Sequence, residues 1–61
     1  MVKRHHNILD YEFEDIINET ENAWLILIRE EEIWFPKSQV EVDEDNNTIS
    51  MPEWLATEKG L

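Results

Sequence analysis

The sequence predicts a mainly β fold: a small antiparallel meander or barrel-like sheet of four to five strands, followed by a short C-terminal helix. Three features support this prediction. Short apolar runs recur between residues 8 and 51, Asn, Asp and Pro residues interrupt them, and a helix-compatible segment follows Pro52. A chain of 61 residues allows one domain, which we expect over residues 8–61 after a flexible tail at residues 1–7.

The first strand is expected within residues 8–18, where apolar and acidic side chains alternate through Tyr11–Glu14. The alternation breaks at residues 15–17, which predicts either a bulge or the end of the strand. Asn and Thr residues at 18–22 then favour a turn. Six consecutive apolar residues at 23–28 predict a second strand that is buried on both faces.

The next connection, at residues 29–32, leads into a return strand at residues 32–35. It lacks the Gly or Asn of a tight primed turn, so we expect a looser one. Pro36 cannot donate to a strand ladder, so the strand should end there, and one turn of 3₁₀ helix or a β-turn should follow. We expect Lys37 and Gln39 to anchor this crossover.

Alternation resumes at residues 39–44, with Val40 and Val42 facing inward. The Asp- and Asn-rich segment 43–47 predicts a turn, because these residues tolerate left-handed backbone conformations. A further short strand is expected at residues 48–51.

The chain should end in a short helix that plugs the curled sheet, and in the strand before it Ile49 and Met51 share one face. Pro52 suits the first helical position, and Glu53 complements the positive end of the helix. Gly60 can end the helix, because glycine readily adopts the left-handed conformation that helix termini require.

The aromatic residues are expected to stabilise the core. Trp34, Phe35 and Trp54 should pack inside the fold, and Trp24 should pair with Trp34 across neighbouring strands. Burial of such rings removes a large apolar area from water, which a domain of this size needs.

Residues 23–28 and 32–35 carry more apolar surface than one small sheet and one short helix can cover. Either the sheet curls until both faces meet the core, or one face is buried in a second subunit. We therefore expect a homodimer. Its interface would contain Trp24, Ile26, Ile28 and Trp34.

The charge of the chain limits its partners. Fifteen acidic residues stand against five basic ones, giving a formal net charge of −10. Nucleic-acid backbones are bound by Lys and Arg, so we expect no direct nucleic-acid binding and instead a basic or nucleic-acid-binding protein partner. The apolar content, 41%, argues against disorder. No apolar run reaches the length of a membrane span or a signal peptide, so we expect a cytoplasmic protein without a membrane partner.

No combination of residues predicts an enzyme. Ser38 and Ser50 would have only His5 and His6 as bases, and we place both histidines in the N-terminal tail. Gly60 is the single glycine, so the chain contains no glycine-rich phosphate loop.

No metal or other cofactor is expected. Residues 43–47 begin like a calcium-binding loop, but Thr48 stands where the loop needs glycine, and Trp54 where it needs glutamate. The adjacent His5 and His6 would point to opposite faces of a strand, so we expect a solvated tail there rather than a metal site.

The segments Trp34-Phe35-Pro36-Lys37-Ser38-Gln39-Val40, Pro52-Glu53-Trp54-Leu55-Ala56 and Glu58-Lys59-Gly60-Leu61 form a joint pattern. This pattern resembles a group of short, uncharacterised bacteriophage and prophage proteins, over about residues 20–61. The resemblance implies a viral or mobile-element origin and a setting in the host cytoplasm. It brings no activity and no functional residues with it.

Acidic residues two positions apart share a strand face, as we expect for Glu12 with Glu14 and for Glu41 with Asp43. Such residues stand about 6.5–7 Å apart, which is comparable to successive phosphates of nucleic acid. One hypothesis is therefore an acidic inhibitor that mimics nucleic acid in a host defence complex, as some anti-CRISPR proteins do. The alternative is a structural or accessory oligomer of a phage replication module, in which charge only confers solubility. The predicted negative face comprises Glu12, Glu14, Asp15, Glu30, Glu31, Glu32, Glu41, Asp43, Glu44 and Asp45.

Overall fold

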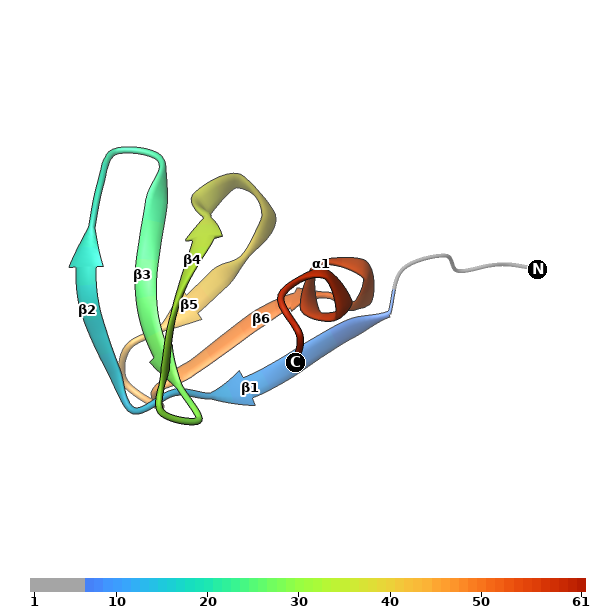
Figure 1. Cartoon of the computed structure of the whole chain (residues 1–61), viewed down its shortest axis with the longest axis horizontal. Helices are drawn as coiled ribbons and strands as arrows, with labels where there is room; N and C mark the ends of the chain where they lie inside the picture. Colours follow the sequence, from blue (N-terminus) through green and yellow to red (C-terminus); the bar gives the residue numbers. More distant parts are fainter. Residues whose placement is uncertain (1–6) are drawn as a thin grey trace.

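The computed structural model of the chain describes residues 7–61. Six strands form two three-stranded antiparallel sheets, with strand orders β1-β6-β5 and β2-β3-β4, and one short helix ends the chain (Figure 1). The predicted mainly β fold with a C-terminal helix is confirmed. In chain order the elements are β1 (Ile8–Glu12), β2 (Asp15–Glu19), β3 (Ala23–Ile28), β4 (Glu31–Pro36), the 3₁₀ helix η1 (Lys37–Gln39), β5 (Glu41–Asp43), β6 (Thr48–Pro52) and α1 (Glu53–Glu58).

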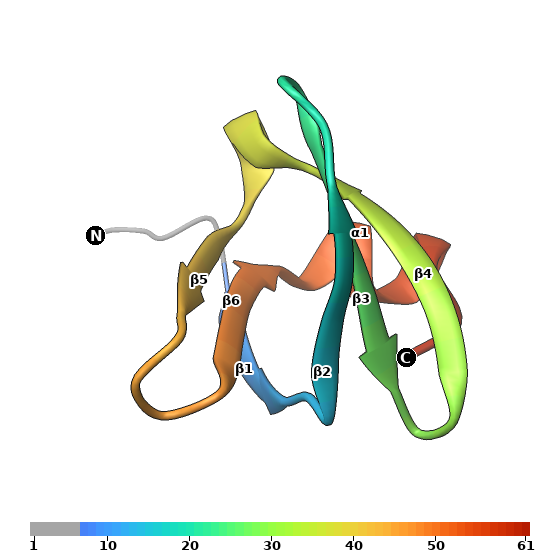
Figure 2. The ribbon, with the colours of Figure 1, turned by 90° about the vertical axis from the view of Figure 1, so that its left-hand side faces the viewer.

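The segment predicted as one strand, residues 8–18, is divided between the two sheets, which is why the structure has six strands. The chain changes sheet at Phe13, whose N–H donates to the carbonyl of Asn47 at 2.9 Å, and at Glu14, whose N–H donates to the carbonyl of Leu27 at 2.8 Å. The Phe13 side chain is buried at this corner and packs in the core that both sheets share. Figure 2 shows β1 passing into β2 between the two sheets.

A β-bulge interrupts β2, which is one of the two alternatives that the broken alternation at residues 15–17 predicted. Ile16 pairs with Ile26, but the next paired residue is Asn18, opposite Leu25. Ile17 is therefore the extra residue, and 41% of it is exposed. The bulge increases the local twist of this edge strand, which discourages pairing with another strand.

The expectation of a loose connection between β3 and β4 is wrong. Ile28 pairs with Glu31, so only Arg29 and Glu30 form the turn. Both have positive φ angles, 54° and 67°, which is the backbone of a type I′ turn. The twist of the hairpin selects this turn, because primed turns match the right-handed twist of the strands they join.

Arg29 and Glu30, the two turn residues with positive φ, each contact a residue near the start of the chain. The Arg29 guanidinium lies 5.6 Å from the centre of the Tyr11 ring. The Glu30 N–H donates to the Glu14 carboxylate at 3.3 Å. The turn that joins β3 and β4 is thus in contact with residues of β1 and of the link between β1 and β2.

Strand β3 covers the predicted residues 23–28, but only one of its faces enters the core. Ile26 and Ile28 are 0% and 1% exposed, whereas Leu25 and Leu27, on the opposite face, are half-buried. The two sheets curve around the first face and leave the second uncovered. The buried core consists of Phe13, Ile26, Ile28, Phe35, Val40, Ile49, Met51, Leu55 and Ala56.

Two of the three aromatic residues expected in the core lie at the surface. Phe35 is fully buried, but 43% of Trp34 and 53% of Trp54 are exposed. The predicted pairing of Trp24 with Trp34 is also wrong, because the register sets Trp24 opposite Phe35 and Trp34 opposite Leu25. Successive residues of a strand point to opposite faces, so burial of Phe35 directs Trp34 outward.

The second half of the chain follows the predicted pattern. Pro36 ends β4 and leads into η1, and Val40 and Val42 pack on the core. Ile49 and Met51 are buried on the inner face of β6.

Helix α1 contacts β1 and β6 and buries Leu55 and Ala56 (Figure 1). It begins at Glu53. The expected place of Pro52 at the first helical position is wrong, because Pro52 keeps an extended conformation with ψ of 150° at the end of β6. Trp54, which precedes this buried pair, is about half exposed. Within residues 7–61 no helix is long and apolar enough to cross a membrane.

Gly60 ends the helix as predicted, with a φ of +83°. Its N–H donates to the carbonyl of Thr57 at 3.1 Å, and the N–H of Leu61 donates to the carbonyl of Ala56 at 2.8 Å. This pair of hydrogen bonds is the Schellman motif. The motif turns Leu61 back against the core.

Residues 1–6 of the predicted tail, including His5 and His6, lie outside the described residues. Asn7 contacts the start of α1: its carbonyl accepts a hydrogen bond from the Glu53 N–H at 2.8 Å. Its side-chain amide in turn donates to the Glu53 carboxylate at 2.9 Å. Asn7, the last residue of the predicted tail, is therefore hydrogen-bonded to the first residue of the helix.

Candidate functional site

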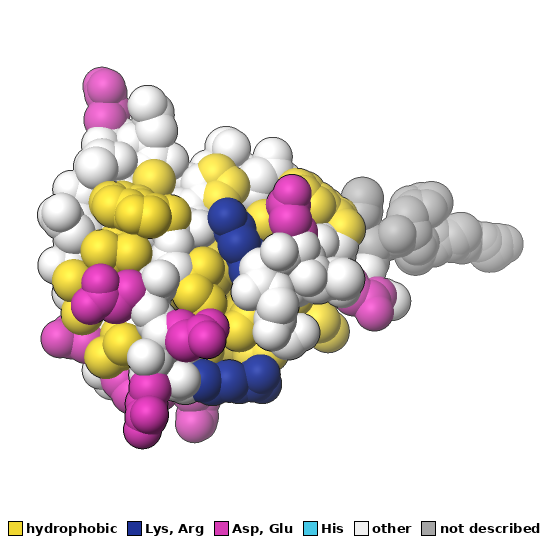
Figure 3. Space-filling view, viewed as in Figure 1, with side chains coloured by type: hydrophobic (Ala, Val, Ile, Leu, Met, Phe, Trp, Pro, Cys, Tyr) yellow, Lys and Arg dark blue, Asp and Glu magenta, His cyan; other side chains and the backbone are white. Residues whose placement is uncertain are grey.

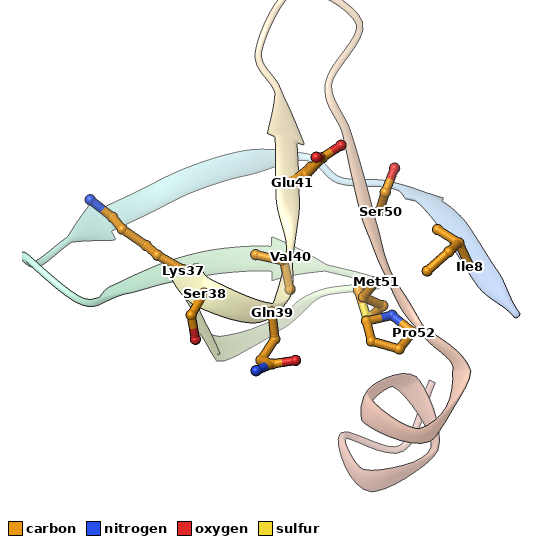
Figure 4. Close-up of a pocket in the computed structure, with 9 residues that line it drawn as sticks. All are labelled: Ile8, Lys37, Ser38, Gln39, Val40, Glu41, Ser50, Met51 and Pro52. Carbon is orange, nitrogen blue, oxygen red and sulfur yellow. The ribbon is translucent and has the colours of Figure 1, made fainter. Parts of the chain in front are cut away.

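An open pocket of about 500 Å³ lies between η1, the start of β5 and the end of β6 (Figure 4). Its polar groups diverge: Glu41 and Ser50 point to one side of the strands, whereas Ser38 and Gln39 point to the other. Small-molecule sites usually hold polar groups that converge on the ligand. The apolar part of the lining comes from Ile8, Val40, Met51 and Pro52.

Two polar residues of this pocket bind other residues of the chain. The Ser50 hydroxyl donates to the Asp10 carboxylate at 2.5 Å, and Lys37 forms an ion pair with Glu19. Lys37 thus joins the crossover to β2, as expected of an anchoring residue. The two candidate bases for Ser38 and Ser50, His5 and His6, lie outside the described residues.

The calcium-like segment 43–47 forms a self-contained turn. One oxygen of the Asp43 carboxylate accepts hydrogen bonds from the N–H groups of Asp45, at 3.1 Å, and Asn46, at 3.3 Å. The other accepts from the Asn46 side-chain amide at 2.8 Å. The Asn46 side chain is the main reason that the pKa of Asp43 lies below its ordinary value. Among residues 7–61 no group of three or more His, Asp or Glu side chains is arranged to hold a metal ion.

The outer surface of the β1-β6-β5 sheet carries an array of four carboxylates. Asp10 and Glu41 lie on either side of Ser50, and Glu12 and Asp43 lie on either side of the β6 residue two positions before it. Ile49 and Met51 of β6 point to the core, so Ser50 and Thr48, which alternate with them, face outward. The four acidic residues paired with Ser50 and Thr48 face outward too. Along a strand the backbone positions of these residues are about 6.5–7 Å apart, and across β6 about 9–10 Å. We call Asp10, Glu12, Glu41 and Asp43 the acidic face.

The remaining predicted acidic residues gather where strands β1, β3 and β5 end. Hydrogen bonds join these segments: Phe13 to Asn47, Glu14 to Leu27, and Glu30 to Glu14. In Figure 1 this is the lower left vertex, where the β3–β4 turn lies beside the start of β2. We call Glu14, Asp15, Glu30, Glu31, Glu32, Glu44 and Asp45 the acidic end.

The structure brings the acidic residues together in a different way than predicted. Glu41 and Asp43 share a face of β5, as expected. Glu12 and Glu14 do not share a face, because the chain changes sheet between them. Asp10 belongs to the array but is absent from the predicted set. It lies two positions from Glu12, the same spacing by which Glu41 and Asp43 were predicted to share a face.

Cations are few around these carboxylates. Of the described Lys and Arg residues, Arg29 alone belongs to a turn of the acidic end, and its guanidinium is stacked on Tyr11. Lys37 follows the opposite end of β4, and Lys59 follows α1. The acidic face and the acidic end therefore present nearly uncompensated negative charge.

The outer surface of the β2-β3-β4 sheet is apolar in its middle. Leu25 lies opposite Trp34, and Leu27 is the next outward residue along β3. Figure 3 shows hydrophobic side chains exposed over this sheet, with acidic side chains beside and below them. We call Leu25, Leu27 and Trp34 the apolar face.

The four residues of the predicted dimer interface do not lie on one surface of the domain. Trp34 lies on the apolar face, but Ile26 and Ile28 are in the core, where a partner cannot touch them without opening the domain. Trp24 points to the inner side, and the Lys37 ammonium lies 4.7 Å from the centre of its ring. Leu25 and Leu27 were missed, since a continuous apolar run does not indicate which alternate residues face outward.

In comparisons with known proteins, the chain matches no family model, no curated protein and no solved structure.

Proposed function

We propose that this chain is a non-enzymatic protein-binding module of bacteriophage type, acting in the host cytoplasm. Its negative surface would occupy the basic groove of a nucleic-acid-binding protein, such as a host defence complex, in the manner of an anti-CRISPR inhibitor. The phage assignment rests on the resemblance carried by residues 34–40 and 52–61. The binding mode rests on the acidic face.

The spacing of the acidic face supports mimicry of a nucleic-acid backbone. The two acidic residues on β1, and the two on β5, occupy backbone positions about 6.5–7 Å apart, which is nearly the distance between successive phosphates. They belong to strands of a packed sheet, so their spacing is fixed before a partner arrives, which lowers the entropy cost of binding. A groove whose Lys and Arg side chains bind phosphates can therefore bind the acidic face instead.

Salt and competing DNA give the direct test of this function. The chain, immobilised on a resin, is exposed to a bacterial lysate and to a panel of purified bacterial nucleases, at about 50 and 200 mM salt. We expect basic nucleic-acid-binding proteins to be retained at low salt and released both by high salt and by duplex DNA. Failure to retain any such protein at low salt would refute mimicry.

The outward-facing Trp34–Leu25 pair favours a second candidate function, a structural or accessory oligomer of a phage replication module. A homodimer formed through the apolar face would bury these side chains and leave the charge to keep the protein soluble. Sedimentation of the pure chain separates the two functions. A dimer that persists at high salt supports the oligomer, and a monomer of 7.4 kDa excludes it.

A further inference from the structure

The outer surface of the β2-β3-β4 sheet combines apolar and acidic side chains in register. Nearest the acidic end, Leu27 lies between Asp15 and Glu32. In the next outward position along β3, Leu25 lies opposite Trp34. Both carboxylates are exposed, so the apolar face has a negative border on its side toward the acidic end.

This negative border indicates the charge of the occupant. A second copy of the chain would bring another net charge of −10 and another pair of carboxylates to the same contact. Like charges that lose water at an interface are unfavourable unless each finds a partner. A protein surface that sets Lys or Arg beside an apolar side chain is complementary to both features.

The exposed indole of Trp34 identifies arginine as the better cation. The chain itself places cations over two of its inward aromatic rings, with Lys37 over Trp24 and Arg29 over Tyr11. Within residues 7–61 no Lys or Arg lies over the Trp34 ring. Trp is the aromatic residue that binds cations most strongly, and a planar guanidinium also stacks on it.

We propose that the apolar face docks a partner segment in which an arginine adjoins an apolar side chain. The apolar side chain packs on Leu25 and Leu27. The guanidinium stacks on Trp34 and forms an ion pair with Glu32, which lies two residues away on the same face of β4. This distance, about 6.5–7 Å between backbone positions, is within the reach of one arginine side chain.

The proposed arginine site shares with the proposed function the basic character of the partner and two residues of the acidic end, Asp15 and Glu32. The acidic face lies on the β1-β6-β5 sheet, whereas the apolar face lies on the β2-β3-β4 sheet. Substitutions on one sheet therefore leave the other surface intact. Loss of mimicry would not remove the arginine site, and loss of the arginine site would not remove mimicry.

A defined peptide tests the site. A fluorescently labelled seven-residue peptide of alternating Arg and Leu is titrated with the full chain, and its anisotropy gives the Kd. One control peptide replaces each Arg by Glu, and another replaces each Leu by Ser. We expect the Arg-Leu peptide to bind most tightly, because it alone supplies both the charge and the apolar contact.

Matched variants locate the binding. Trp34→Ala should weaken binding of the Arg-Leu peptide by roughly tenfold, as truncation of a central Trp does at many interfaces. Trp54→Ala removes a similarly exposed ring from α1 and should change the Kd by less than about twofold. Glu32→Gln should weaken binding, whereas Glu58→Gln, at the end of α1, should not.

A second variant separates the guanidinium contact from simple apolar packing. Trp34→Leu keeps an apolar side chain but removes the aromatic ring, so it should reduce the preference for Arg over Lys in an otherwise equal peptide. Circular dichroism and thermal melting of each variant show that it folds.

Three results would overturn the inference. The first is an equal Kd for Trp34→Ala and Trp54→Ala. The second is equal binding of the Glu-Leu peptide, since the site would then have no charge preference. The third is a homodimer, detected by sedimentation, that Trp34→Ala dissociates, because a second copy would then occupy the apolar face.

Discussion

Trp34 lies directly opposite Leu25 across the β3–β4 ladder, on the side of the sheet that faces away from the core, and 43% of it is exposed. The register of this hairpin determines that position. A slip of one residue would direct Trp34 inward and Phe35 outward. The two-residue turn at Arg29–Glu30 therefore decides which aromatic ring stabilises the domain and which is available to a partner.

Replacement of Glu30 by glycine should stabilise the domain by about 0.5–1 kcal/mol, because Glu30 adopts a φ of 67° that glycine adopts more easily. The variant also removes one charge from the acidic end. Glu30→Gln is the matched control, since it removes the charge without relieving the backbone. Urea unfolding compares the two, and equal stabilities would mean that the turn is not strained.

Phe35 and Trp54 should differ sharply in their contribution to stability. Phe35→Ala should cost about 3–5 kcal/mol, as expected for a fully buried ring. Trp54→Ala should cost less, about 1–2 kcal/mol, because 53% of Trp54 is exposed and only the covered part of its ring loses contacts. Urea denaturation of both variants measures this difference. A large loss for Trp54→Ala would contradict the outward position of its ring.

The ionised carboxylate of Asp43 should stabilise the β5–β6 turn, and acid should remove this stabilisation. Hydrogen bonds, chiefly from the Asn46 side chain, lower the pKa of Asp43 in the folded state below its ordinary value. A lowered folded pKa means that this stabilisation is present above the unfolded pKa and is lost as the pH falls through the folded one. NMR titration of the Asp43 carboxyl measures the shift.

Asn46→Ala provides the control for that titration. It removes the largest cause of the shift, so the pKa of Asp43 should rise toward its ordinary value. An unchanged titration midpoint would mean that the turn does not hold the carboxylate as described.

Local signals in the sequence were sufficient for several elements. The bounds of β3, the turn of 3₁₀ helix after Pro36 and the helix end at Gly60 follow from residues that act within a few positions of themselves. The bulge in β2 also left a local signal, since the apolar alternation breaks where Ile17 is inserted.

The surfaces depended on pairing between distant segments. Glu12 and Asp43 join one array only because β1 and β5 both pair with β6. Which alternate residues of β3 face outward depends on the curvature of two sheets around one core, and an apolar run does not encode that choice. The tight turn at Arg29–Glu30 was missed because hairpin twist outweighed the missing glycine.

The most direct test of the central claim, that the acidic face binds in place of nucleic acid, is a comparison of two double variants with equal net charge. Glu12→Gln with Glu41→Gln removes two carboxylates from the acidic face, and Glu21→Gln with Glu58→Gln removes two exposed carboxylates elsewhere. The measurement is the Kd of each for a nucleic-acid-binding protein that duplex DNA displaces from the unmodified chain. We predict that the first variant binds at least about fivefold more weakly than the second, corresponding to about 1 kcal/mol. Equal affinities would contradict the claim, because net charge alone would then account for the binding.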